Sequence, residues 1–324
     1  MRRIIVTGAL GYIGSRLIRE LPLAFPDVEV LMLDNFATQQ YGSLFQLPRR
    51  GRYRFLEADV LDAGLTSIFS GGDVVIHLAA IPPGGSDTSQ QMEQVNIAGT
   101  ERVAQACAAT GALMIFPSTT SIYSPHASTV DEDCLPRDLE PQSPYAASKL
   151  RAEQILTSLA GSHNLRFVTC RFGTIFGVSP GMRFHTAVNK FVWQACMGIP
   201  LTVWRTALHQ KRPYLDLEDA IRALLFIIRG QAQQSQTYNV LTTNATVVEN
   251  IEYIRRHVPD LEVDYVDSPI MNDLSYAVSC EKFKRLGFEF AGSLVGGIGA
   301  TIQLLLDSNR EFHDSVPILT KESA

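Results

Sequence analysis

The segment Thr7-Gly8-Ala9-Leu10-Gly11-Tyr12-Ile13-Gly14 joins an apolar, β-branched run, Arg3–Thr7, to a helical pattern over Gly11–Leu21 that we expect to stop at Pro22. Its glycines permit a tight turn and let the backbone approach a pyrophosphate held at the positive end of the helix. The spacing is GxxGxxG, and the strand before it and the helix after it strengthen an otherwise weak pattern. The alternative is a glycine-rich turn in an α/β protein that binds no nucleotide. We predict a dinucleotide site that includes Gly8, Gly11, Tyr12, Ile13 and Gly14.

Short apolar runs alternate with helical patterns through the first half of the chain. This alternation indicates βαβ units around a parallel sheet. The predicted fold class is therefore α/β, with a doubly wound parallel (Rossmann) sheet. The strands expected after the first are Glu29–Asp34, Arg54–Glu57, Asp73–Leu78, Leu113–Ser118 and Arg166–Arg171, and the longer helices are Met92–Thr110 and Pro144–Ala160.

The pattern changes after residue 171. Pro180, Pro200 and Pro213 interrupt the periodicity, and helices such as Asp219–Ile228 alternate with short extended pieces such as Thr237–Leu241. We predict an NAD-binding Rossmann domain over residues 1–172 and a smaller, mixed α/β substrate-binding lobe over residues 173–324. The boundary is soft, because the chain can cross back between two such lobes.

Composition excludes several classes of protein. Hydrophobic residues make up 46% of the 324 residues and charged residues 19%, as expected for a soluble globular chain. The 28 basic and 33 acidic residues give a net charge of -5, and no block of basic residues predicts nucleic-acid binding. Five scattered cysteines without a CxxC pair favour a reducing compartment over a disulfide framework or zinc site.

No segment of the sequence predicts insertion into a membrane. The first apolar run meets glycines too soon for a signal peptide. The charge-free stretch Phe290–Leu306 contains four glycines, which argues against a membrane span. We therefore expect a cytoplasmic protein with no membrane partner.

Asp34 ends the second expected strand, 20 residues after Gly14. That is the distance expected for a carboxylate that accepts the adenosine ribose hydroxyls. Its charge would repel a 2′-phosphate, and no arginine follows in Asn35–Gln40, so we expect NAD rather than NADP. The alternative is that Asp34 only caps the following loop. Asp59, after the third strand, could accept the adenine amino group or serve as a turn carboxylate.

Tyr145-Ala146-Ala147-Ser148-Lys149 places a tyrosine and a lysine at i and i+4, on one face of the helix after Pro144. A nearby ammonium group stabilises a phenolate, so this spacing can lower the pKa of Tyr145 from about 10 toward working pH. Tyr145 would then act as a general base toward a hydroxyl group and, when protonated, as an acid toward a carbonyl group.

Several motifs occur in an order that resembles the extended short-chain dehydrogenase/reductase family, in particular its NAD-dependent nucleotide-sugar epimerase/dehydratase branch. The resemblance covers nearly the whole chain. The motifs are TGALGYIG, Asp34-Asn35, Ala58-Asp59-Val60, His77-Leu78-Ala79-Ala80, Asn96, Ser118–Tyr123 and YAASK. Two later segments, Arg171–Gly177 and Arg212–Asp219, look like further motifs of that branch.

The resemblance implies catalytic and cofactor roles by position. Thr119 corresponds to the hydroxyl residue that completes the catalytic set with Tyr145 and Lys149, and it would help to pass a proton to Tyr145. The alternative for Ser118–Ser121 is a polar strand end. Lys149 would also hold the nicotinamide ribose. Besides the glycine segment, the implied cofactor contacts are Asp34, Asn35, Asp59, Val60, Leu78, Ala79, Ala80, Asn96, Tyr145 and Lys149, and no metal is expected.

Substrate contacts follow from the same resemblance. Asn189 resembles an asparagine that meets a nucleotide diphosphate, and Val203 lies in a segment like the one that flanks the nucleobase. Arg212 resembles an arginine that pairs with the diphosphate, and Arg183 is a candidate for a phosphate or a substrate carboxylate. Each arginine could instead be a surface cation. The implied substrate contacts are Ser118, Thr119, Thr174, Arg183, Asn189, Val203 and Arg212.

Two departures from the family pattern bear on the reaction. Thr174 stands where the family commonly has asparagine, which puts the sugar or diphosphate contact there in doubt. In 4,6-dehydratases of the family an acidic pair follows the catalytic threonine, but this chain has Thr120 and Ser121. Neither is a useful acid or base near pH 7, so 4,6-dehydration is disfavoured. Cys134 is a candidate acid or base for enolisation, although a lone loop cysteine is usually inert.

The function we expect is an NAD-dependent nucleotide-sugar epimerase that acts at C4, with hydride returned to the other face of a transient keto sugar. The first alternative is an NAD-dependent dehydrogenase or reductase with net turnover on a sugar or another secondary alcohol. The second is a non-catalytic dinucleotide sensor. The resemblance also implies a homodimer, paired through the helices Met92–Thr110 and Pro144–Ala160.

Overall fold

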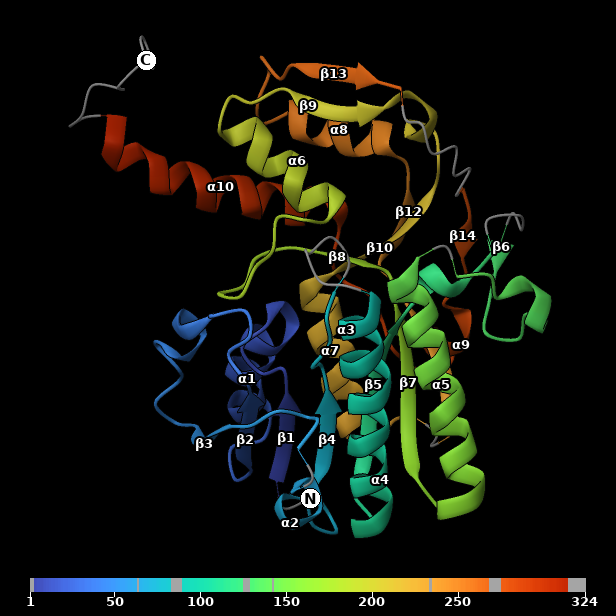
Figure 1. Ribbon diagram of the computed structural model, residues 1–324. Helices are drawn as coiled ribbons and strands as arrows, with labels where there is room; N and C mark the ends of the chain where they lie inside the picture. The colour runs from blue at the N-terminus through green and yellow to red at the C-terminus, as the bar shows by residue number, and fades with distance from the viewer. Residues whose placement is uncertain are drawn as a thin grey trace.

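The computed structural model of the protein describes residues 3–62, 64–82, 89–124, 129–141, 143–232, 235–267 and 275–313. Within them, seven parallel strands form one sheet in the order β11-β7-β5-β4-β1-β2-β3 (Figure 1). This is the doubly wound sheet that the sequence predicts, so the α/β Rossmann class is confirmed. The strands are β1 (Arg3–Thr7), β2 (Glu29–Asp34), β3 (Arg52–Glu57), β4 (Val74–His77), β5 (Leu113–Thr119), β7 (Arg166–Phe172) and β11 (Gln236–Val240).

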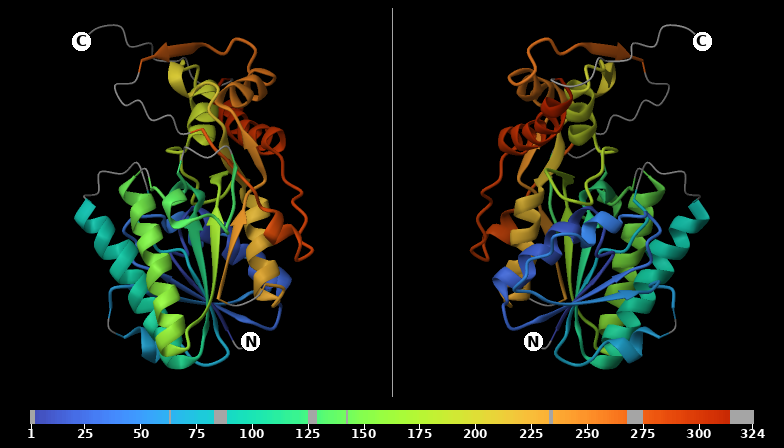
Figure 2. Two further views of the ribbon diagram at one scale, coloured as in Figure 1. Left: turned by 90° about the vertical axis from the view of Figure 1, so that its right-hand side faces the viewer. Right: turned by 90° about the vertical axis from the view of Figure 1, so that its left-hand side faces the viewer.

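Helices cover both faces of the sheet, and Figure 2 shows the three layers edge-on. In β1, Ile4 and Val6 pack into one core cluster and Ile5 into another, because successive side chains of a strand point to opposite faces. The first cluster lies under α1 (Tyr12–Ala24) and α7 (Leu217–Ile228). The second lies under the helix pair α4 (Thr100–Thr110) and α5 (Pro144–His163), with the short α2 (Leu65–Ile68) nearby.

Helix α1 continues through Pro22 to Ala24, so the predicted stop at Pro22 is wrong. Proline has no N–H to donate to the carbonyl four residues earlier, which is that of Ile18. The hydroxyl of Tyr53, on β3, donates to the Ile18 carbonyl instead, at 3.1 Å. A tertiary hydrogen bond therefore replaces the bond that the proline removes.

The helix predicted over Met92–Thr110 is not uniform. It begins as α3 (Ser89–Glu93), widens into a π-helical turn over Gln94–Gly99, and continues as α4. π-helical turns are rare and are frequent at functional sites. Asn96, one of the expected cofactor residues, lies in this turn.

The second half of the chain builds a smaller lobe above the carboxyl ends of the sheet strands (Figure 1). The chain first leaves the sheet after β7, returns to supply α7 and β11, and then leaves again. The lobe has its own core under α6, α8 and α10. Its elements are β8 (Thr174–Phe176), α6 (Ala187–Cys196), β9 (Leu201–Trp204), β10 (Arg212–Asp216), β12 (Thr243–Ala245), α8 (Val247–Arg255), β13 (Val263–Val266) and α10 (Leu294–His313).

Three further elements lie at the side of the sheet. Strands β6 (Thr129–Val130) and β14 (Ala277–Val278) pair in parallel, and α9 (Glu281–Lys284) follows. A domain boundary at residue 172 stays a prediction. Helix α7 and strand β11 come after residue 172 in the sequence, but they pack with the large sheet of the first half of the chain. Among the described residues, no helix combines the length and apolar character needed to cross a membrane.

Candidate active site

The glycine segment turns sharply between β1 and α1. Gly8 has φ +65°, and a Cβ there would lie 2.6 Å from the backbone nitrogen of Ala79. A Cβ at Gly14 would lie 2.4 Å from the carbonyl oxygen of Gly8. Only glycine lets these backbone segments approach so closely. Helix α1 then begins at Tyr12 without a side-chain cap, so its first N–H groups have no partner within the helix. Such an end suits an anionic group.

The carboxylate of Asp34 lies at the end of β2, beside this turn. Its Oδ2 accepts from the backbone N–H of Leu10 at 3.0 Å, and its Oδ1 accepts from Phe36 at 3.0 Å. Asp34 therefore braces the glycine turn and caps its own loop, and both oxygens keep a lone pair for another donor. Asn35 donates through Nδ2 to Asp59 at 2.8 Å, which links the ends of β2 and β3.

The residues after β4 pack against the glycine turn on the side opposite Asp34. The backbone N–H of Leu78 donates to the Thr7 carbonyl at 3.0 Å, and that of Ala79 to the Thr7 hydroxyl at 3.3 Å. Ala80 follows, half-buried. Asn96 clamps the next residue, because its Oδ1 accepts from the Ile81 N–H at 2.7 Å and its Nδ2 donates to the Ile81 carbonyl at 3.0 Å. Asn96 is thus a buried clamp on this segment.

The side chain of Val60 has a packing contact. It is buried against Gly99, where a Cβ would lie 2.8 Å from its Cγ2. Ile13, on the first turn of α1, is partly buried against the sheet core.

Together with the glycine turn and Asp34, these residues form a cradle at the carboxyl edge of β1, β2 and β4. The cradle fits a dinucleotide, because glycines leave room for a pyrophosphate at a bare helix end and a carboxylate with spare lone pairs lies beside it.

Lys149 links α5, the helix that also carries Tyr145, to the carboxyl end of β5, where Thr119 lies, and its Nζ is 6.0 Å from the ring centre of Tyr145. Ser143 caps α5 by accepting from the Ala146 N–H at 3.1 Å, and Pro144 occupies the first helical position. One turn into the helix, Lys149 is buried and its Nζ donates to the Pro117 carbonyl of β5 at 2.9 Å. Thr119 ends β5, and its Oγ1 accepts from the Ser121 N–H at 3.1 Å.

Ser118 lies between Pro117 and Thr119. Its side chain is 4% exposed, and its Oγ has no hydrogen-bond partner among the described residues. An unpaired buried hydroxyl is costly, so a ligand oxygen or nitrogen at this position would stabilise it.

Burial acts on both titratable groups of the pair. Burial raises the pKa of Tyr145 to about 12, although the positive charge of Arg183 acts to lower it. Burial also lowers the pKa of the Lys149 ammonium to about 8, although the carboxylate of Glu153 acts to raise it. The expected lowering of the Tyr145 pKa is therefore not found in the protein alone. Desolvation of the phenolate outweighs the charge of Arg183.

The expected substrate residue Asn189 contacts Tyr12 of the cofactor cradle. Asn189 donates through Nδ2 to the Tyr12 hydroxyl and to the Arg183 carbonyl, each at 2.8 Å, so both amide hydrogens are used. Its Oδ1 is buried and has no partner among the described residues. The remaining free atom is an acceptor, which suits a hydroxyl or N–H of a ligand better than a phosphate oxygen. Tyr12 in turn donates to the Gly177 carbonyl at 2.5 Å.

The other expected substrate residues lie in the second lobe. Thr174 begins β8, half-buried, in register with Tyr214 of β10. Val203 is buried in the core of the lobe. The guanidinium of Arg212 lies 5.9 Å from the ring centre of Tyr276, whose hydroxyl donates to the Thr120 carbonyl at 3.2 Å. Arg212 therefore lies near the catalytic strand end, whereas the Val203 side chain faces inward.

Two groups support the site in ways that the sequence analysis did not predict: His77, which it named in a motif without a role, and Tyr276, which it did not name. His77, at the end of β4, hydrogen-bonds Thr7 at 2.8 Å and Thr100 at 3.0 Å, and burial lowers its pKa to about 3. Tyr276 was absent from every predicted motif. Only the tertiary structure brings it to the strand end, so a single sequence carries no signal for it.

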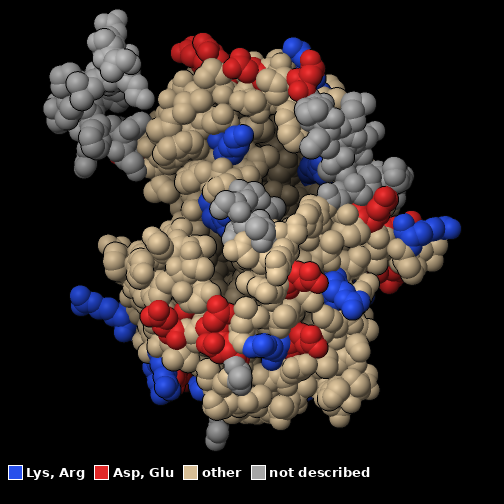
Figure 3. Space-filling model, viewed as in Figure 1, with Lys and Arg blue, Asp and Glu red and all other residues tan. Residues whose placement is uncertain are grey.

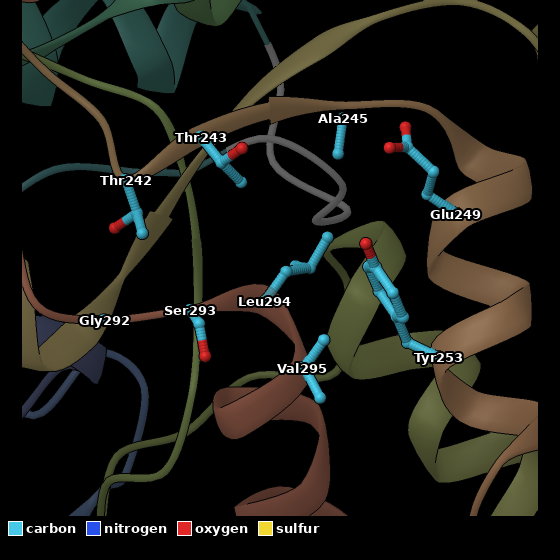
Figure 4. A pocket seen from close by; sticks show the side chains of 9 residues that line it. All are labelled: Thr242, Thr243, Ala245, Glu249, Tyr253, Gly292, Ser293, Leu294 and Val295. Atoms are coloured by element: carbon cyan, nitrogen blue, oxygen red, sulfur yellow. The ribbon is translucent and has the colours of Figure 1, made fainter.

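Figure 3 shows a hollow between the two lobes, with Lys and Arg side chains along its upper wall. A separate pocket of about 310 Å³ lies in the second lobe, between β12, α8 and the start of α10 (Figure 4). None of Thr119, Tyr145 and Lys149 lines it. Its walls are Thr242, Thr243, Ala245, Glu249, Tyr253, Gly292, Ser293, Leu294 and Val295. Across the described residues, no three His, Cys, Asp or Glu side chains form a group that could hold a metal ion.

Comparison with known proteins supports the predicted family. Residues 4–240 match the model of the NAD dependent epimerase/dehydratase family. The trifunctional UDP-glucose 4,6-dehydratase/UDP-4-keto-6-deoxy-D-glucose 3,5-epimerase/UDP-4-keto-L-rhamnose-reductase of Arabidopsis thaliana is 27% identical over 304 residues, which are 89% of this chain and 45% of that protein. The chain thus spans about half the length of this relative.

A shorter relative and a solved structure match more of their own length. The uncharacterized UDP-glucose epimerase YtcB of Bacillus subtilis is 29% identical over 249 residues, 74% of this chain and 76% of that protein. The structure of UDP-glucuronic acid 4-epimerase from Bacillus cereus, in complex with UDP-glucuronic acid and NAD, has a TM-score of 0.85 at 26% identity. The match covers 94% of this chain and 99% of that chain.

We predict that Gly14→Ala weakens binding of NADH. The added Cβ must displace the Gly8 carbonyl, and overpacking of this kind costs about 1–3 kcal/mol, so the Kd should rise about 5- to 150-fold if the cost falls on the bound form. Fluorescence titration of NADH measures the change. Gly42→Ala is the matched control, because a Cβ there meets nothing within 4 Å. Unchanged affinity in Gly14→Ala would contradict the assignment of the cradle.

Proposed function

The chain belongs to the NAD dependent epimerase/dehydratase family, and from that premise we propose that it is a nucleotide-sugar epimerase that acts at C4. The chain is of the class of NAD-dependent epimerases and oxidoreductases of the extended short-chain dehydrogenase/reductase type. The prediction of NAD as cofactor is confirmed for the family. The observation that supports the proposal is Lys149, which binds the strand end before Thr119 and lies 6.0 Å from the Tyr145 ring centre, together with the lack of an acidic pair after Thr119 in the sequence.

Tyr145 takes the proton of the sugar hydroxyl in the proposed mechanism. NAD, when bound, would supply a hydride acceptor. Burial raises the pKa of Tyr145 to about 12 and the charge of Arg183 acts to lower it, so Arg183 favours the phenolate that the transfer requires. Thr119 hydrogen-bonds the same sugar oxygen and holds it for the transfer.

Tyr145 also returns the proton. Loss of hydride and proton leaves a keto sugar, which presents its other face before it is reduced, and the phenol then protonates the new alkoxide. The ammonium of Lys149 holds a ribose hydroxyl of the cofactor and stabilises the phenolate. The reaction has no net change in oxidation state, so each turnover leaves the protein ready for the next.

The residues after Thr119 speak against 4,6-dehydration, although relatives include dehydratases. Thr120 is 1% exposed and its hydroxyl donates to the Phe172 carbonyl at 3.3 Å, so it is directed into the protein. Ser121 follows in the short helical turn. Neither side chain can remove or supply a proton near pH 7 as a carboxylate would.

The substrate proposed is a UDP-sugar, because the epimerases among the similar proteins named above act on UDP-sugars by their names, although other relatives are dTDP-glucose 4,6-dehydratases. Arg183 acts electrostatically on Tyr145, which supports its proposed role as the partner of a sugar carboxylate, such as that of UDP-glucuronic acid. Ser118, Asn189 and Arg212 are the proposed polar contacts. The assignments of Thr174 and Val203 stay proposals with weaker support, because Val203 is buried in the lobe core.

A dehydrogenase or reductase with net turnover is the alternative function. It uses the same Thr119, Tyr145 and Lys149 and differs only in the release of the keto product and NADH. The residues of the site are common to both reactions, so the products decide between them. A non-catalytic sensor is disfavoured, because it has no need of a buried lysine beside a tyrosine.

Our proposal includes a homodimer and a cytoplasmic location. Helices α4 and α5 lie side by side on one face of the sheet (Figure 1), which makes them available as a pairing surface. Light scattering at micromolar concentration should give twice the chain mass of 35.7 kDa. A particle of a single chain's mass would contradict the dimer.

The test of function is incubation with a panel of UDP-, GDP-, CDP- and dTDP-sugars, with UDP-glucuronic acid as the first member. We expect NMR to show a new stereoisomer at C4 of a UDP-sugar, without absorbance from accumulated NADH. A keto product with accumulating NADH would contradict the epimerase and establish the dehydrogenase. Turnover of no sugar in the panel would contradict the proposed substrate class.

Tyr145→Phe should lower kcat by a factor of about 10²–10⁴, the usual contribution of a positioned acid or base. Its affinity for NADH and its melting temperature should stay close to those of the unchanged protein, because the ring remains. Tyr41→Phe, at a tyrosine that is 53% exposed, is the matched control and should leave kcat unchanged. Full activity in Tyr145→Phe would remove Tyr145 from the mechanism.

A further inference from the structure

A buried ion pair joins α5 to β7 behind the catalytic side chains. Arg171 Nη2 lies 2.8 Å from Glu153 Oε2, and Arg171 Nε donates to both carboxylate oxygens at 3.2 Å. The two side chains are 8% and 9% exposed. This many charge-assisted bonds define one relative position of the helix and the strand.

The same guanidinium reaches the segment that follows Thr119. Arg171 Nη1 donates to the Tyr123 hydroxyl at 2.8 Å, and that hydroxyl donates to Asn239 Oδ1 of β11 at 2.8 Å. Tyr123 is fully buried and comes four residues after Thr119. One arginine therefore links the catalytic helix, the end of the catalytic strand and two sheet strands.

The position of Glu153 on α5 relates it directly to the reaction. Tyr145, Lys149 and Glu153 are spaced by four residues each, so they lie on one face of the helix. A pair that fixes Glu153 against β7 also fixes the rotation of α5 about its axis. That rotation decides whether Lys149 reaches the Pro117 carbonyl, and it sets the direction of Tyr145 one turn earlier on the same face.

The charges around Lys149 come from several elements. Tyr145 and Glu153 lie on the same helix as Lys149. His77 on β4 is a neutral ring on which the charge of Lys149 acts. Arg171 on β7 is hydrogen-bonded to Glu153. Arg183 acts on the neighbouring Tyr145. Glu153 is the carboxylate that opposes the loss of the proton from Lys149. A charged Lys149 is the form that stabilises a phenolate, so this carboxylate favours the catalytic state.

We propose that Glu153 and Arg171 form a positioning pair, which holds the face of α5 that carries Tyr145 and Lys149 and keeps a carboxylate one turn from the lysine ammonium. The proposal rests on the proposed function for its consequence in catalysis. Its physical content concerns Lys149 alone and is tested without substrate or cofactor.

The experiment is a titration of Lys149 by NMR in protein labelled with ¹³C-lysine. The chain has six lysines, so the Cε signals are few, and Lys149→Arg identifies the signal of Lys149. The ammonium is charged below its pKa, and Glu153→Gln removes a stabilising charge and leaves Arg171 uncompensated. The midpoint of Lys149 should therefore fall by about one pH unit. The lysines are Lys149, Lys190, Lys211, Lys282, Lys284 and Lys321.

Two variants separate the charge effect from loss of stability. Glu153→Asp keeps the charge and should restore the midpoint. Asp73→Asn breaks a comparable pair, Arg3 Nη2 to Asp73 Oδ2 at 2.6 Å, at the opposite ends of the sheet strands, and should leave the midpoint unchanged. If Glu153→Gln does not fold, Glu153→Leu with Arg171→Leu removes both charges and should lower the midpoint in the same direction.

An unchanged midpoint in the folded Glu153→Gln or double variant would overturn the proposal. An equal shift in Asp73→Asn would also overturn it, because the effect would then be general destabilisation. Since the titration needs neither a sugar nor NAD, its result is independent of whether the sugar panel shows turnover.

Discussion

The buried ammonium of Lys149 is the group on which the geometry of the site depends. A buried charge is costly unless hydrogen bonds satisfy it, and here the Pro117 carbonyl accepts from it at 2.9 Å while the Phe116 ring lies 4.5 Å away. This bond requires the start of α5 to meet the carboxyl end of β5. Thr119 lies two residues beyond Pro117, and the Tyr145 ring centre is 6.0 Å from the same ammonium. Satisfying one charge thus ties the helix of Tyr145 to the strand end of Thr119, the groups of the proposed reaction.

The cofactor cradle and the second lobe are joined by backbone contacts at the glycine turn. Tyr12, at the start of α1, donates to the Gly177 carbonyl and accepts from Asn189. A Cβ at Gly181 would lie 2.6 Å from the carbonyl oxygens of Leu10 and Gly11, so the loop after β8 rests directly on the turn. The substrate side and the cofactor side are therefore one continuous surface, which suits a reaction in which hydride leaves and returns within one site.

The parts of the structure that local sequence patterns encode could be predicted. The alternation of strands and helices, the glycine turn with Asp34 and the pairing of Tyr145 with Lys149 depend on residues that are close in sequence or on motifs with known spacing. Features that depend on distant contacts were missed. The passage of α1 through Pro22 needs the hydroxyl of Tyr53, and the direction of the shift in the Tyr145 pKa depends on burial that no spacing reveals. The roles of the individual site residues remain proposals.

In the proposed reaction, hydride leaves one carbon of the sugar and returns to the same carbon within the site. The direct measurement uses UDP-glucuronic acid that carries deuterium at C4, with the products analysed by NMR and mass spectrometry. The account predicts a C4 epimer that retains its deuterium at C4, with none in the solvent and none in released NADH. Loss of the deuterium to solvent, or its recovery in free NADH beside a keto sugar, would contradict it.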